Sequence, residues 1–150
     1  MRKIRVSRLL LAAAALAAAP IAPADVSPVG RWKVVSDQTN RPVAIMQVFE
    51  RDGEYGGYIE RILERPKDAA VQVCGRCPGE LKGQPIEGLV IMHGLKGSGG
   101  EFSGGHILDP DSGHYYRVKM TVGPEGQTLK VRGYLGISLL GRTQTWYRVD

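Results

Sequence analysis

Residues 114–135, HYYRVKMTVGPEGQTLKVRGYL, decide the fold class. Apolar side chains recur at every second position on both sides of a Pro124-Glu125-Gly126 turn, and more polar side chains stand between them. Alternation with period two is typical of a β-strand that buries one face, and the turn predicts that the two strands form an antiparallel hairpin. The inward positions of this hairpin are predicted to be Tyr116, Val118, Met120, Val122, Leu129, Val131 and Gly133.

Similar short segments rich in Val, Ile, Tyr and Met cover the rest of the chain after its first 28 residues, and short turns such as Asp52-Gly53 connect several of them. Closing the sheet into an eight-stranded antiparallel up-and-down barrel removes both exposed edges, so we predict an all-β barrel, with a β-sandwich as the alternative. The second half of the third segment also fits a helical turn. The predicted strands are Val29–Ser36, Pro42–Arg51, Glu54–Arg65, Glu87–Leu95, Glu101–Leu108, His114–Val122, Gln127–Leu135 and Arg142–Val149.

The first 24 residues have the features of a secretory signal peptide. Four basic residues precede an apolar run from Leu9 to Ala19, and the small residues Ala22 and Ala24 predict cleavage after Ala24. Residues 25–150 then form a single barrel domain that is periplasmic or secreted. The mature chain carries 16 basic and 15 acidic residues, which argues against nucleic acid as a partner. It contains no further apolar run long enough to cross a membrane.

The connector at residues 66–86 carries both cysteines and lacks apolar periodicity, so we expect a flap loop. In an oxidising compartment, Cys74 and Cys77 most simply form a disulfide, which would pin the flap locally with about 2 kcal/mol. The alternative is a thiol-disulfide exchange centre. Such a centre normally lies at a helix N-terminus, and no helix is predicted beside these cysteines.

No other pattern predicts catalysis, a cofactor or a metal site. His93 and His106 fall within predicted strands where a cross-strand pair can meet, but the spacing of the three histidines is not diagnostic of zinc. Ser103 lacks the strand-turn-helix context of a nucleophile, and Asp109 belongs to a turn sequence. We therefore assign no catalytic residue, no metal ligand and no cofactor.

Two motifs at opposite ends of the mature chain resemble those of lipocalins and the wider calycin group: Gly30-Arg31-Trp32 and Arg148. In that group the tryptophan closes one end of the barrel and a late arginine packs across its indole, so the resemblance implies a closing contact between Trp32 and Arg148, with Gly30 beside them.

A longer series of motifs resembles a family of exported bacterial proteins known as domain of unknown function 2147 (DUF2147). The resemblance implies export and a lipocalin-like barrel, and it brings no established activity. Phe102 stands where a tryptophan is expected. The matching motifs are Gly30-Arg31-Trp32 with Asp37, Tyr55-Gly56-Gly57, Cys74-Gly75-Arg76-Cys77, Gly88-Leu89-Val90-Ile91, Ser103-Gly104-Gly105, Ile107-Leu108-Asp109-Pro110 with Gly113, Gly133-Tyr134-Leu135-Gly136 and Leu140-Gly141-Arg142-Thr143-Gln144-Thr145-Trp146.

Three functions follow from this fold. The first is binding of a small, largely apolar ligand inside the barrel, because an eight-stranded barrel can hold one small molecule. The second is a solid barrel that engages an envelope protein through its flap or the apolar loop at residues 137–140. The third, an enzyme such as a thiol oxidoreductase, lacks a supporting group of residues. The ligand-lining candidates are Trp32, Tyr116, Val118, Met120, Val131 and Trp146.

Overall fold

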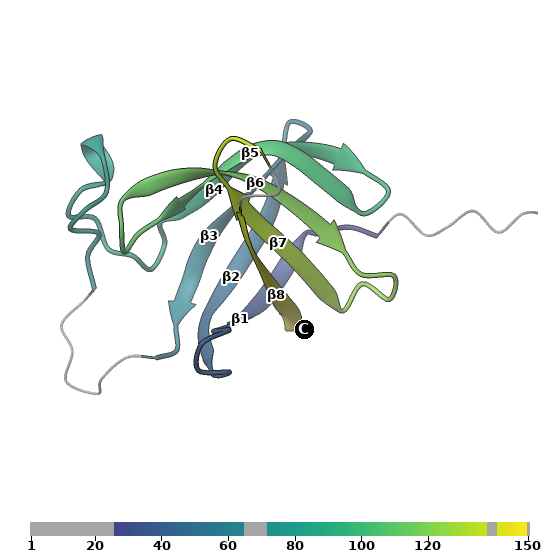
Figure 1. Ribbon diagram of the computed structural model, residues 1–150, viewed down its shortest axis with the longest axis horizontal. Helices are drawn as coiled ribbons and strands as arrows, with labels where there is room; N and C mark the ends of the chain where they lie inside the picture. Colours follow the sequence, from purple (N-terminus) through teal and green to yellow (C-terminus); the bar gives the residue numbers. More distant parts are fainter. Residues whose placement is uncertain (1–25, 65–71, 138–140, 150) are drawn as a thin grey trace, which may run out of the picture.

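The computed structural model describes residues 26–64, 72–137 and 141–149 (Figure 1). The predicted signal peptide at residues 1–24, part of the predicted flap at residues 66–71 and the loop positions 138–140 lie outside these ranges. Eight strands and one short 3-10 helix, η1, make up the regular structure. They are β1 (Gly30–Val35), β2 (Pro42–Arg51), β3 (Glu54–Ile62), η1 (Gly79–Leu81), β4 (Val90–Ser98), β5 (Glu101–Asp109), β6 (His114–Val122), β7 (Thr128–Tyr134) and β8 (Gly141–Val149).

The strands form a closed antiparallel barrel in chain order, from β1 to β8 and back to β1. Closure is direct, because β1 pairs with β8 over four residues that include Trp32 opposite Arg148. This topology confirms the predicted eight-stranded barrel and excludes the β-sandwich alternative. The hairpin that decided the fold class is present as predicted, with Val118 opposite Gly133 and Met120 opposite Val131.

Two predicted strands differ from the structure by more than one residue at an end. The third ends at Ile62 instead of Arg65, and the fourth runs from Val90 to Ser98 instead of from Glu87 to Leu95. The reason is a turn at residues 86–89, where Gly88 has a φ of 91° and the Glu87 carboxylate accepts a hydrogen bond from the Ile62 amide at 2.9 Å. Within the turn the Leu89 amide donates to the Ile86 carbonyl at 3.1 Å, so the regular pairing of the strand begins later.

The described part of the predicted flap, residues 72–86, is a small folded unit. An isolated bridge joins Val73 to Pro85, the Cys74 amide donates to the Gln84 carbonyl at 2.8 Å, and Cys74 is disulfide-bonded to Cys77. Both cysteines are buried and belong to the hydrophobic core cluster. In Figure 1 this unit lies at the left, beside the barrel wall. The predicted disulfide is thus present in the structure.

Because all neighbouring strands are antiparallel, successive connections alternate between the two ends of the barrel. One end carries residues 26–29 and the turns at residues 52–53, 99–100 and 123–127, and we call it the closed end. The other end carries the connections at residues 36–41 and 110–113 and the described parts of the two remaining connections, residues 63–64, 72–89 and 135–137, and we call it the open end. The hydrophobic core fills the closed half, where Val48, Met120 and Leu129 are fully buried.

Candidate functional site at the open end of the barrel

The closed end is sealed by Arg148 and Trp32. The guanidinium carbon of Arg148 lies 4.2 Å from the centre of the Trp32 ring system, and the indole Nε1 donates to the Pro28 carbonyl at 2.8 Å. Arg148 also donates to three backbone carbonyls, those of Ser27, Val29 and Gly126. These bonds tie the segment before β1 to the β6–β7 turn across the barrel end. A solvent-open surface hollow lies between these two segments, lined by residues 26, 27, 29, 124–127 and Arg148.

Gly30 is required at this end. Its φ is 138°, and a Cβ there would stand 2.5 Å from Nη1 of Arg148. Any larger residue at this position would therefore push the arginine away from the indole.

The six predicted ligand-lining residues all contribute to the barrel interior, but they differ in accessibility. Trp32, Val118, Met120, Val131 and Trp146 expose between 0 and 4% of their surface and belong to the packed core. A side chain with so little accessible surface has no water-sized space beside it. Tyr116, which lies nearest the open end, is half-buried. Accessible interior surface therefore begins at the level of Tyr116.

Gly133 creates space at this level. A Cβ on Gly133 would lie 3.7 Å from the Tyr116 Cβ and 3.8 Å from a methyl carbon of Ile107, which are ordinary contact distances. Ile107 lies two strands away, and side chains of strands two apart converge only on the concave face of a barrel. The glycine thus faces inward and leaves room between Tyr116, Ile107 and its cross-strand partner Arg142. Ile107, Tyr116 and Gly133 are each partly exposed.

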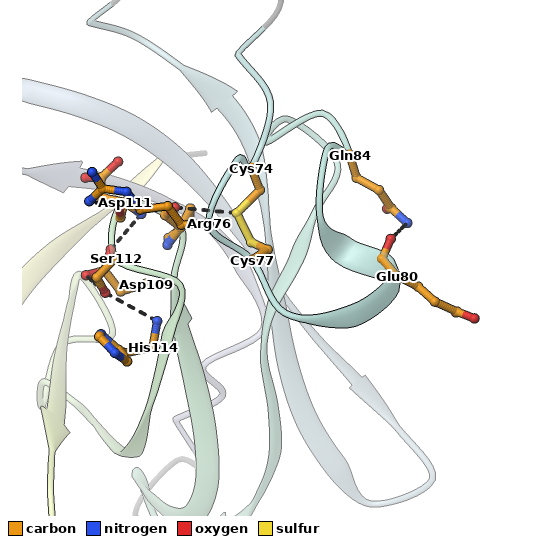
Figure 2. The surroundings of a disulfide bond; sticks show 10 residues. Cys74, Arg76, Cys77, Glu80, Gln84, Asp109, Asp111, Ser112 and His114 are labelled. Atoms are coloured by element: carbon orange, nitrogen blue, oxygen red, sulfur yellow. Dashed lines mark hydrogen bonds between the residues drawn. A yellow bond between two sulfur atoms is a disulfide. The ribbon is translucent and has the colours of Figure 1, made fainter.

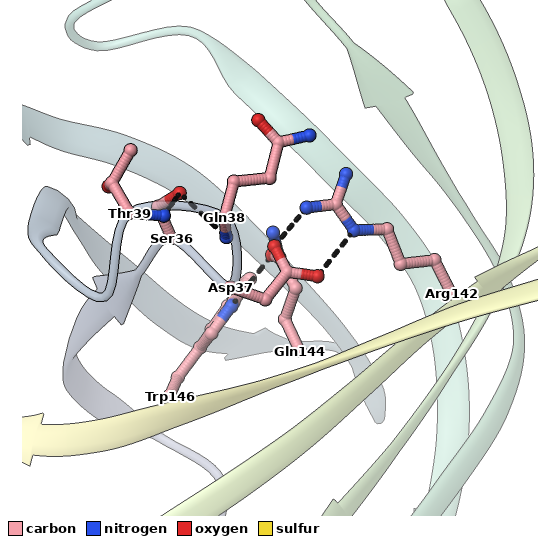
Figure 3. A network of polar contacts seen from close by, with 7 residues as sticks. All are labelled: Ser36, Asp37, Gln38, Thr39, Arg142, Gln144 and Trp146. Atoms are coloured by element: carbon pink, nitrogen blue, oxygen red, sulfur yellow. Dashed lines mark hydrogen bonds and ion pairs between the residues drawn. The ribbon is translucent and has the colours of Figure 1, made fainter.

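A network of polar side chains joins β8 to the β1–β2 connection (Figure 3). It includes Arg142, the cross-strand partner of Gly133. Arg142 donates to both carboxylate oxygens of Asp37, from Nε to Oδ2 at 2.8 Å and from Nη2 to Oδ1. Two residues further along β8, toward the closed end, the side-chain oxygen of Gln144 accepts a hydrogen bond from the Trp146 indole nitrogen at 3.3 Å. We call Asp37, Ile107, Tyr116, Gly133, Arg142 and Gln144 the mouth residues.

The ion pair changes the pKa of both of its members. The hydrogen bonds from Arg142 hold the pKa of Asp37 below its ordinary value, although partial desolvation opposes this effect. Asp37 in turn raises the pKa of Arg142, and the charge of Asp109 adds to this increase. Both side chains are about half exposed, so solvent screens their attraction. The pair therefore stays ionised, and its two opposite charges lie side by side at the rim of the open end.

The disulfide-bonded unit contacts the β5–β6 turn at the open end (Figure 2). Arg76 donates to the Asp111 carbonyl at 3.2 Å, and the Cys74 sulfur lies 3.4 Å from the Pro110 carbonyl oxygen. Within the turn, the Asp109 carboxylate accepts from the Ser112 hydroxyl at 2.7 Å and from the Asp111 amide at 3.0 Å. Asp109 therefore acts as a turn-forming residue, and the disulfide fixes the unit against the β5–β6 turn.

Sequence reasoning placed Asp37, Arg142 and Gln144 only within family motifs. It predicted Gly133 as an inward position of the hairpin, and it did not predict these residues as a site. The strand parity of β8 carried a usable signal, because Arg142 and Gln144 share the inward face of Trp146 and Arg148. The partner of Arg142 carried none, since Asp37 lies 105 positions earlier in a turn.

Neither a metal centre of three or more side-chain ligands nor a membrane-spanning helix is found in the part of the chain that the structure describes. Among the described residues, no group of three or more His, Cys, Asp or Glu side chains is arranged to hold a metal ion. Within the same ranges, no helix combines the length and the hydropathy needed to cross a membrane.

Comparisons with known proteins agree with this architecture. The model of a family described as "Uncharacterized protein conserved in bacteria (DUF2147)" matches residues 30–148. Among solved structures, the chain is similar to protein HP1028 from the human pathogen Helicobacter pylori, which is described as belonging to the lipocalin family. The TM-score is 0.72 at 18% sequence identity, over 83% of this chain and 84% of that chain. No curated protein matches the sequence significantly.

Proposed function

The chain belongs to the DUF2147 family of uncharacterised bacterial proteins, and from its lipocalin-like barrel we propose that it binds a small amphipathic molecule in the open half of that barrel. The observation that carries the proposal is the inward-facing Gly133. A Cβ on this residue would be in ordinary contact with Tyr116 and Ile107, so the glycine leaves room for about a methyl group at the level where interior side chains become partly exposed. Small-molecule sites are typically concave, largely apolar and supplied with a few polar groups.

The mouth residues favour a ligand with one apolar and one polar end. Ile107 and the Tyr116 ring offer apolar surface below the rim, and burying such surface contributes about 25 cal/mol per Å². Arg142 offers hydrogen-bond donors at the rim, and Gln144 lies deeper in the barrel, opposite Val131. A carboxylate or another anionic group on the ligand can replace Asp37 as the partner of Arg142, because a guanidinium binds such groups in a bidentate geometry.

We further propose that the protein works after export, in the periplasm or outside the cell. The signal-like sequence at residues 1–24 supports this location, and so does the disulfide, since disulfides persist in oxidising compartments. In such a place the barrel would meet its ligand in water or at the envelope.

The alternative function is that of an envelope interaction protein without a small ligand. It is favoured by the sealed closed half and by the apolar side chains of Leu135 and Ile137, each 60% exposed beside the open end. The two functions differ in one respect that can be measured: only the first requires the space at Gly133.

A plug substitution tests the proposal. We suggest titrating the mature protein with anilinonaphthalene sulfonate, a fluorescent amphipathic anion, and comparing Gly133→Leu with Lys130→Leu. The control places the same side chain on the same strand at an exposed, outward position. Fluorescence enhancement should occur in the wild type and in Lys130→Leu and be lost in Gly133→Leu, while all three melt cooperatively. Equal enhancement in the wild type and in Gly133→Leu would contradict binding at the mouth.

A further inference from the structure

A pair of histidines lies on the outer face of the barrel wall, away from the mouth residues. His93 on β4 and His106 on β5 are directly opposite each other in the strand register. Their ring centroids are 5.9 Å apart with an interplanar angle of 32°, and both side chains are exposed. Neither imidazole has a hydrogen-bonding partner within the described residues. Two imidazoles are thus held side by side and free to use their ring nitrogens.

The geometry of the pair fits a shared metal ion. A first-row divalent ion binds an imidazole nitrogen at about 2.0–2.1 Å. A metal-bound imidazole has its ring centroid about 3.2 Å from the ion, so two imidazoles at an angle of about 90–110° have their centroids about 4.5–5.2 Å apart. The observed separation of 5.9 Å is somewhat longer. Rotation of the two side chains must therefore bring the rings closer before both nitrogens can bind one ion.

We propose that His93 and His106 together bind an exchangeable divalent transition-metal ion, with Cu²⁺ bound more tightly than Zn²⁺. Imidazole ligands suit both ions, and the general order of affinities favours copper. Rigid backbone pairing holds the two ligands, so little conformational freedom is lost on binding.

Neighbouring side chains and the small number of protein ligands limit the affinity of this histidine pair for a metal ion. The Tyr115 ring stands edge-on to His93 at 6.1 Å and shields one side, while Arg117, the cross-strand partner of His106, places a positive charge on the other. With two protein ligands, the remaining coordination positions are filled by water. The ion is therefore bound more weakly than in a four-ligand structural site and stays exchangeable.

The third histidine provides a matched control. His114 is exposed like the other two, and it lies at the start of β6, beside the β5–β6 turn. We suggest titrating the mature protein calorimetrically with a copper salt and with a zinc salt at neutral pH, and comparing His93→Gln, His106→Gln, the double variant and His114→Gln.

One equivalent of Cu²⁺ should bind to the wild type and to His114→Gln. In each single variant of the pair the affinity should fall at least about tenfold, because only one imidazole ligand remains. Cu²⁺ should broaden the ring-proton resonances of His93 and His106 selectively. Unchanged affinity in the double variant, or no binding by the wild type, would overturn the proposal.

Discussion

Arg148 stacks over the indole of Trp32, with 4.2 Å between the guanidinium carbon and the ring centroid, and so joins the last strand of the barrel to the first. The two residues are also direct partners in the β1–β8 register. A single residue pair thus combines backbone closure with a cation-π contact and with the hydrogen bonds that Arg148 donates to the segment before β1. Closure of the barrel depends on this pair.

Trp32→Ala is expected to lower the free energy of unfolding by about 3–5 kcal/mol, because it removes a fully buried indole and leaves a cavity at the closed end. This is a large part of the stability of a small domain. Urea denaturation checks the value, with Tyr147→Ala as the control, since that side chain is exposed on the paired strand. If Trp32→Ala melts like the control, the contact does not close the barrel.

Arg148→Met is expected to destabilise the protein less, by about 2 kcal/mol, since the alkyl part of the side chain still covers the indole while the charge-assisted bonds to carbonyl oxygens are lost. The same urea titration measures the difference. Amide hydrogen exchange should become faster mainly at residues 26–29 and 124–127, which those bonds hold. Uniform acceleration over all eight strands would argue against a local role.

Replacing both Cys74 and Cys77 with alanine is expected to lower stability by only about 2 kcal/mol, because the disulfide closes a very short loop. Alanine is preferable to serine, since both positions are buried and a hydroxyl would need a partner there. Proteolysis should then cut within residues 72–86 before the barrel is lost. Thiol labelling of the wild type without reductant should detect no free cysteine, and labelling there would contradict the disulfide.

Acid should weaken the mouth through Asp37. The pKa of this carboxyl is lower in the folded protein than its ordinary value of 3.8, so folding favours the charged form. Its contribution is fully present above that value and is lost as the pH falls through the lower, folded pKa. The stability advantage of the wild type over Asp37→Asn should therefore shrink as the pH falls below 3.8 and be lost once the pH has passed the lower, folded pKa. An advantage that persists at the lowest pH would assign it to another cause.

The sequence predicted the barrel because its information is local and repeated: the alternation in residues 114–135 and the turns between segments were sufficient to indicate eight antiparallel strands. The predicted start of β4 at Glu87 was wrong because the Glu87 side chain accepts a hydrogen bond from the Ile62 amide, a contact between residues 25 positions apart. The mouth was not predicted for a related reason. Period two marks which side chains face inward, but it does not reveal at which level the core stops being sealed. The level at which interior side chains become accessible depends on how the neighbours of Gly133 pack. It can be determined only from the three-dimensional arrangement of Tyr116 and Ile107.

Native mass spectrometry of protein purified from its own cell envelope tests the central claim, a ligand in the open half of the barrel, most directly. The account predicts that the wild type and Lys130→Leu carry the same discrete small-molecule adduct and that Gly133→Leu, folded and equally abundant, carries none. An adduct that persists in Gly133→Leu, or wild-type protein that is free of any adduct, would contradict it.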